Sequence, residues 1–134
     1  MSTCASTHFG YRSSAAKTVI LRQATVGWDA PSTFLPGPLI EVLDETGRTV
    51  FQAPAKPWHN GDVHEQSGDR VWWFDFSAVT QPGRYRIAER RSGEITEEFV
   101  VFAEPYRDVL RQALRMFYHQ RCGIKKQQPF TEAP

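Results

Sequence analysis

The chain has 134 residues, 40% hydrophobic and 23% charged, and its 16 basic side chains nearly balance its 15 acidic ones. A domain of this length buries about two-thirds of its unfolded surface, so one hydrophobic core is enough to fold it. A net charge of +1 lacks the electrostatic footprint of a protein that binds nucleic acid or an anionic membrane, so neither partner is expected. The two cysteines, Cys4 and Cys122, form neither a disulfide framework nor a metal-ligand set, and we expect no cofactor.

The N-terminal segment 1–7 lacks the basic start and the apolar run of a secretory signal. No segment reaches the length of a membrane span. We therefore expect either a cytoplasmic protein or a protein from which a signal has been removed.

The first half of the chain has the pattern of short strands separated by loops. Alternating apolar residues predict strands at 17–23, 39–44 and 49–52, and the last two flank a hairpin turn that contains Gly47. Three prolines in 27–38 cannot lie inside a central strand, so this segment is predicted to be a long loop. A second loop, polar and rich in proline, is predicted at 53–68.

Three more strands are predicted at 70–76, 84–89 and 96–102. In the first of these, alternation puts Trp73 on the face opposite three large aromatic side chains of the core, Trp72, Phe74 and Phe76. About seven strands with closely spaced turns predict an all-β fold, an antiparallel β-sandwich of immunoglobulin type.

One amphipathic helix is predicted at 104–123, bounded by Pro105 in its first turn and by Gly123 at its C-cap. Its apolar residues recur at helical spacing: Tyr106, Val109, Leu110, Ala113, Leu114 and Phe117. The stripe from Tyr106 to Leu114 is expected to pack on the sandwich. From Phe117 onward, apolar and aromatic residues surround the helix, so we expect a second body to cover that end.

Three motifs occur in order along the chain: His8-Phe9-Gly10-Tyr11, then Asp75-Phe76-Ser77 followed by Pro82-Gly83-Arg84-Tyr85, and finally 117–123. Together they resemble the N-terminal immunoglobulin-like domain of family 9 glycoside hydrolases, the cellulase-type enzymes. The resemblance covers nearly the whole chain, residues 7–123, although Thr7 and His8 stand where the family usually has Asn and Gln. In that family the last motif begins the first helix of the catalytic domain.

The resemblance implies that the catalytic carboxylates lie in an α-helical barrel that follows this chain, so no catalytic residue is expected here. It divides the chain into a sandwich at 7–103 and, at 104–134, a connector helix with the start of a missing catalytic domain. The residues expected to contact the barrel are Phe117, Tyr118, Arg121 and Cys122. The domain would stabilise a secreted or periplasmic enzyme that hydrolyses a β-1,4-glucan such as cellulose.

The tryptophans leave an alternative function open. Trp73, Trp58 and Trp28 could stack on sugar rings, which would make the domain an independent carbohydrate-binding module. The other interpretation is that Trp73 is covered by a neighbouring domain or loop and that Trp58 and Trp28 anchor loops. A third hypothesis is an interaction domain that shares only the sandwich fold.

Two polar features have structural explanations. His59 and His64 lie five residues apart with Asp62 and Glu65 in a loop, where no regular element fixes a third metal ligand, so a solvated loop is expected and no metal site. Asp75, the acid set in the apolar strand, is expected to bond the backbone of the following turn.

Overall fold

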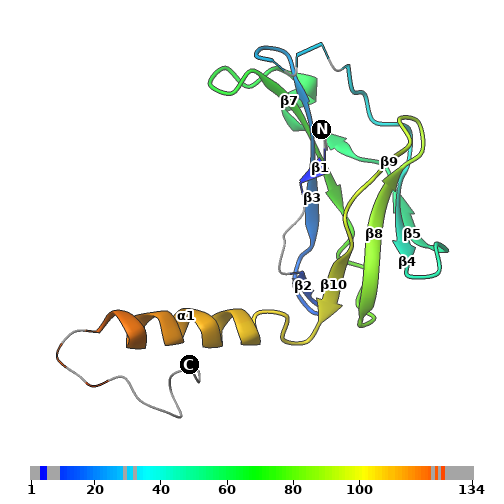
Figure 1. The fold of residues 1–134 in the computed structure, drawn as a ribbon. Coiled ribbons are helices and arrows are strands. Elements are labelled where there is room, and N and C mark those ends of the chain that lie inside the picture. Colours follow the sequence, from blue (N-terminus) through cyan, green and yellow to red (C-terminus); the bar gives the residue numbers. More distant parts are fainter. Residues whose placement is uncertain are drawn as a thin grey trace.

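The computed structural model describes residues 4–5, 10–28, 30–31, 33–121, 123 and 125. Two facing β-sheets form a sandwich, and one helix extends from its end (Figure 1). Among these residues the first sheet has four strands in the order β1-β3-β7-β6: β1 (Cys4–Ala5), β3 (Thr18–Ala24), β6 (Lys56–Pro57) and β7 (Asp69–Asp75). The predicted immunoglobulin-like sandwich with one C-terminal helix is confirmed.

The second sheet has six strands within the described part of the chain, in the order β2-β10-β8-β4-β5, with β9 paired to β8. Its strands are β2 (Tyr11–Arg12), β4 (Ile40–Asp44), β5 (Thr49–Ala53), β8 (Gly83–Glu89), β9 (Glu94–Ile95) and β10 (Phe99–Phe102). The pairs are antiparallel except β2 with β10, which run parallel. The second sheet is therefore mixed at this edge, within the sandwich that was predicted to be antiparallel.

Lys17 stabilises the segment that connects β2 in the second sheet to β3 in the first sheet. Its side chain is fully buried, and its ammonium donates to the carbonyls of Ser13, at 2.9 Å, and Ala15, at 2.8 Å. Burial lowers the pKa of Lys17, and the charge of Asp75 opposes that shift. The carbonyls thus replace the water that a buried ammonium loses.

The predicted strand at 96–102 is wrong in its extent. Ile95 in β9 pairs with Ala88, whereas Phe99 in β10 pairs with Tyr85. The stretch from β9 to β10 therefore contains one residue more than the part of β8 that it faces. An extra residue of this kind is the signature of a β-bulge, which interrupts a strand that alternation alone would make continuous. The other predicted strands agree with the structure to within one or two residues.

The segment predicted as a loop at 53–68 also holds two short regular elements, β6 and the 3₁₀ helix η1 (Trp58–Gly61). Pro57 can lie in β6 because β6 is at the edge of its sheet, where a strand can lack an N–H donor. The prolines of this segment therefore mark a sheet edge as well as a loop.

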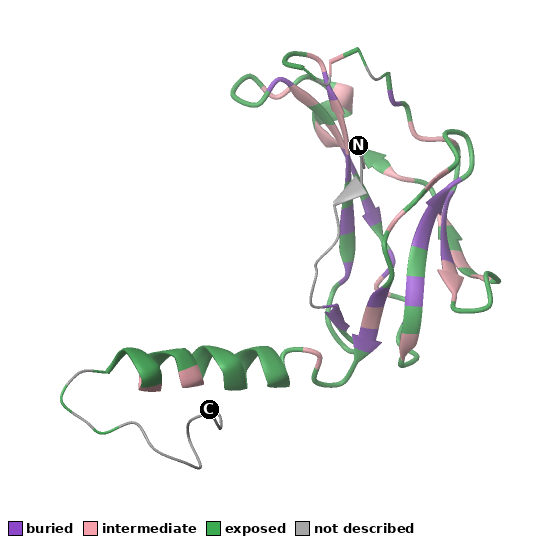
Figure 2. Cartoon of the chain, in the orientation of Figure 1, coloured by how far each residue is buried: buried purple, intermediate pink, exposed green. Residues whose placement is uncertain are grey.

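The core lies between the two sheets and appears purple in Figure 2. It includes residues of the first two motifs, Tyr11 and Phe76, whose rings meet edge-on with centres 5.1 Å apart, and Phe99 of β10, whose ring centre lies 5.4 Å from that of Tyr11. Phe34, from the long loop, packs edge-on against Trp72 with ring centres 6.2 Å apart. Gly10 precedes Tyr11 with a φ of 89°, and a side chain there would collide with the Val100 carbonyl.

Helix α1 (Arg107–Gln120) projects away from the sandwich (Figure 1). None of its residues is buried (Figure 2). The expectation that the stripe from Tyr106 to Leu114 packs on the sandwich is wrong for Leu110 and Leu114, which are 60% and 59% exposed, whereas Tyr106 donates a hydrogen bond to the Gly10 carbonyl of the sandwich. Periodicity identifies an apolar face, but it does not identify the body that covers the face.

The predicted helix ends also need correction. The helix starts at Arg107, two residues after Pro105, which lies in the turn before it. It ends at Gln120, and the Arg121 N–H donates to the Phe117 carbonyl at 3.1 Å. Gly123 lies beyond this end in a turn with a φ of 78°.

Candidate functional site

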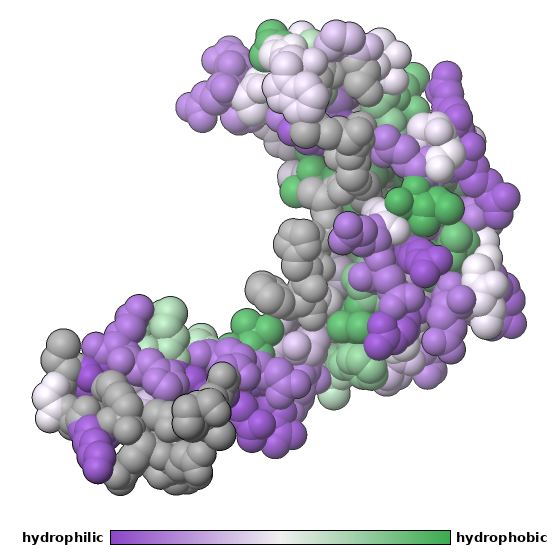
Figure 3. Space-filling model, in the orientation of Figure 1, coloured by the Kyte–Doolittle hydropathy of each residue, from purple (hydrophilic) through white to green (hydrophobic). Residues whose placement is uncertain are grey.

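Helix α1 carries a row of exposed apolar side chains that we call the α1 apolar face: Tyr106, Val109, Leu110, Leu114 and Phe117. Their spacing places them along one side of the helix. The side of the helix seen in Figure 3 is mostly hydrophilic with a few hydrophobic side chains, and a hollow separates the helix from the sandwich. Several large apolar side chains exposed on one side of a helix mark a candidate site of protein contact.

The residues predicted to contact a second domain lie at the far end of this helix. Phe117 belongs to the α1 apolar face and is 64% exposed. Tyr118 lies beside that face, half-buried, with its ring edge-on to His119 at 5.5 Å. Arg121 is exposed just past the helix, and Cys122 lies outside the described residues. The sequence prediction placed Leu110 and Leu114 in the same stripe but assigned them to the sandwich, so it missed that they are exposed together with Phe117.

The three candidate tryptophans do not form one surface. Trp73 points outward from β7 and is 50% exposed, and Trp72 is buried as predicted. Trp58 stacks on His59 with ring centres 4.0 Å apart, so its partner is a neighbouring side chain. Trp28 is 74% exposed in the long loop. Of these, Trp73 lines a groove of about 340 Å³ together with Lys56 and Asp75.

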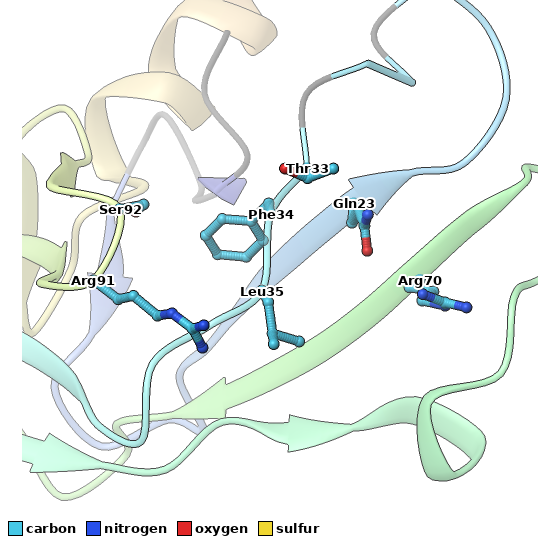
Figure 4. Close-up of a pocket in the computed structure, with 7 residues that line it drawn as sticks. All are labelled: Gln23, Thr33, Phe34, Leu35, Arg70, Arg91 and Ser92. Carbon is cyan, nitrogen blue, oxygen red and sulfur yellow. The ribbon is translucent and has the colours of Figure 1, made fainter.

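A different hollow, of about 410 Å³, lies where the long loop passes over β3 and β7 (Figure 4). Arg70 and Arg91 lie on opposite sides of Leu35 there, and Gln23 of β3 also lines the hollow. Among the described residues that line this hollow, none carries a carboxyl, thiol or imidazole group. The hollow therefore offers side chains that could bind a ligand but no catalytic acid or nucleophile of those types. Sequence reasoning missed this site because the topology brings together residues far apart in the chain.

Carboxyl groups in the described part of the chain hold turns and strand edges. Asp75 accepts from the Ser77 N–H at 2.8 Å, as predicted, and its bonds with Ser77 hold its pKa below the usual range. A hydrogen bond from Arg90 to Glu41, at 2.6 Å, likewise lowers the pKa of Glu41. Hydrolysis of a glycosidic bond needs a carboxylic acid whose pKa is raised. These carboxyl groups therefore have the electrostatics of structural residues.

The two loop histidines make contacts of their own. His64 accepts through Nδ1 from the Ser67 N–H at 3.3 Å, and His59 stacks on Trp58. Among the residues that the structure describes, no three His, Cys, Asp or Glu side chains gather closely enough to hold a metal. No helix in the described part is long and apolar enough to cross a membrane.

Comparison with known families accounts for the sandwich and its motifs. Residues 8–94 match the family described as the cellulase N-terminal Ig-like domain. The chain belongs to this family. The resemblance to the N-terminal domain of family 9 glycoside hydrolases is thereby confirmed, and the Ig-like domain supplies most of the chain.

Known relatives of the Ig-like domain are much longer proteins. A cellodextrinase of Butyrivibrio fibrisolvens is 27% identical over 82 residues, which are 61% of this chain and 14% of that relative. A metagenome-derived family 9 endoglucanase is 28% identical with a TM-score of 0.66, covering 91% of this chain and 22% of that one. AaCel9A, solved in complex with cellobiose-like isofagomine, is 25% identical with a TM-score of 0.67, covering 92% and 19%.

Proposed function

We propose that the Ig-like domain is a non-catalytic module of a family 9 glycoside hydrolase, and that the α1 apolar face docks it on the catalytic domain of the same polypeptide. The observation that carries this proposal is the exposure of Leu110, Leu114 and Phe117 on a helix that buries none of its residues. Hydrophobic side chains on one face of a helix need a covering partner. The relatives support the choice of partner, because the matched region is between 14% and 22% of their length.

Docking would stabilise the helix, the sandwich and the catalytic domain. A helix of 14 residues such as α1 is marginal in water when nothing packs on it. Apolar area removed from water contributes about 25 cal/mol per Å², from which the cost of ordering side chains is subtracted. The Ig-like domain would therefore hold α1 against the catalytic barrel, and the barrel would carry out the hydrolysis of a β-1,4-glucan.

The downward shifts in carboxyl pKa support the non-catalytic part of the proposal. Asp44, Glu41, Asp75 and Glu89 all have a pKa below the usual range. Each is ionised at neutral pH and cannot serve as a general acid there. The purified chain is expected to release no reducing sugar from carboxymethylcellulose.

The first test is the reading frame that follows residue 134. A continuation that encodes a catalytic domain supports the proposal, and an immediate stop codon contradicts it.

In the longer polypeptide, Phe117→Asp is expected to lower the Tm by several degrees, because it places a charge in the docked face. The matched control is Gln112→Asp, which adds the same charge to an exposed position on the other side of α1. Equal Tm values for both variants would show that this face docks on nothing.

A further inference from the structure

Trp73 is held at the surface by the alternation of β7. Trp72 and Phe74 on either side of it are buried, which directs the Trp73 side chain to the outer face of the sheet. Ile20 pairs with Trp73 from β3, and Lys56 pairs with it from β6. The indole is therefore fixed by strands on both sides while half of its surface stays exposed.

Trp73 lies in an elongated groove at one edge of the sandwich. The hollow of about 340 Å³ around Trp73 shares Phe51 and Ala78 with a second hollow of about 450 Å³ that reaches Arg48. We call the two together the Trp73 groove. It follows β5, which ends its sheet in the strand order, so the groove runs beside an open strand edge. Its shape suits a linear polymer.

The charges that line the Trp73 groove balance. Lys56 and Asp75 lie at the Trp73 end, and Arg48 and Asp44 lie at the other, where Arg48 Nε is 3.5 Å from an Asp44 carboxylate oxygen. Such a lining favours neither a polyanion nor a polycation. It does offer the Lys56 ammonium and the Arg48 guanidinium as donors and the carboxylates of Asp75 and Asp44 as acceptors, which suit the hydroxyl groups of an uncharged ligand.

An aromatic ring beside mixed donors and acceptors fits a sugar. The face of an indole can cover the apolar C–H face of a pyranose, while the flanking polar groups bond the hydroxyls. We propose that the Trp73 groove binds a neutral β-glucan chain, with Trp73 as the stacking platform and Lys56 as a hydrogen-bond donor. The choice of glucose polymers among neutral sugars rests on the proposed function as a module of a cellulase.

Affinity electrophoresis of the chain in native gels containing hydroxyethylcellulose tests this site. The unaltered chain is expected to be retarded, and Trp73→Ala is expected to bind about tenfold more weakly, as for an aromatic residue at the centre of a binding surface. Trp28→Ala is the matched control, because Trp28 is a more exposed tryptophan and should leave the retardation unchanged. Trp73→Phe keeps a ring and should retain part of it. Circular dichroism melting checks that each variant folds.

Two outcomes would overturn the inference. One is migration of the unaltered chain that does not change with polymer concentration. The other is equal retardation of Trp73→Ala and Trp28→Ala, which would indicate nonspecific contact. The Tm test of the docked α1 face is independent, so failure in the gel with a positive Tm result would leave an accessory domain without a glucan site. A drop in the Tm of the longer polypeptide on Trp73→Ala, with no glucan binding, would show instead that the catalytic domain covers the groove.

Discussion

Glu89 is a buried carboxylate at the end of β8 whose role is to hold the turn that follows. Its oxygens accept from the N–H groups of Gly37 at 3.0 Å, Arg91 at 3.0 Å and Ser92 at 2.6 Å. Burial raises the pKa of Glu89. The hydrogen bonds from Ser92, Arg91 and Gly37 together lower the pKa by more than burial raises it, so the pKa lies below its ordinary value. The ionised side chain therefore ties the long loop to the hairpin between β8 and β9.

Glu89→Gln is expected to lower the free energy of unfolding by about 1.5–3 kcal/mol at pH 7, since hydrogen bonds to a charged group are lost. Because the pKa of Glu89 is depressed in the folded state, its contribution is complete above the ordinary pKa of 4.5 and is lost as the pH falls through the folded value. The gap between the unaltered chain and Glu89→Gln should narrow from pH 7 to pH 3 in urea unfolding. Glu97→Gln, at an exposed position, is the control, and a gap that is constant with pH would contradict the role of the charge.

Single residues differ in how well the sequence predicts them. The outward face of Trp73 and the turn-holding role of Asp75 follow from alternation and from the polar turn that comes next, and both are confirmed. Lys17 was missed. It shares the alternation of Val19 and Leu21, which puts it on the core face, but the cost of burying a charge argues against that position until its carbonyl partners are known.

At the scale of elements, helix α1 behaves unlike the strands. The strands cover one another, whereas the α1 apolar face is open to water in the described structure. Leu114→Glu exchanges two residues of similar helix propensity, so it tests the packing of this face alone. We expect it to change the free energy of unfolding by less than about 0.5 kcal/mol, as for an exposed position.

The contrasting variant is Ile87→Ala in β8, where the side chain is buried in the core. Removing such a side chain is expected to cost about 2–5 kcal/mol. Urea unfolding followed by tryptophan fluorescence measures both variants under the same conditions. If Leu114→Glu proved as costly as Ile87→Ala, the helix would be packed on the sandwich in solution.

Element positions were predictable where one local rule applied. Alternation located β3, β4, β5, β7 and β8 to within two residues, because each has one face in the core. It failed between β9 and β10, where a bulge near Thr96 depends on pairing with Ile87. The placement of α1 failed for a related reason, since the partner of a helix face is a property of the assembly and is not written in the periodicity of the helix.

At the scale of the whole molecule, the sandwich closes its core without the helix. The 14 buried hydrophobic residues of the core cluster all precede residue 102. Within the described residues, the Tyr106 hydroxyl just before the helix donates to the Gly10 carbonyl of the sandwich at 2.9 Å. The candidate docking face and the candidate glucan groove thus lie on different elements, and each can be altered without the other.

A chain ending at residue 103 is therefore expected to fold and to keep most of its stability. It loses the Tyr106 hydrogen bond, which contributes about 0.5–1.5 kcal/mol, and no buried hydrophobic side chain of the described core. Thermal unfolding of the shortened and full chains should give cooperative transitions that differ by only a few degrees. Tyr106→Phe in the full chain is the control, because it removes the same hydroxyl while keeping the helix. Loss of cooperative unfolding in the shortened chain, with Tyr106→Phe unaffected, would mean that residues 104–134 complete the core, and the division of the chain at 103 would be wrong.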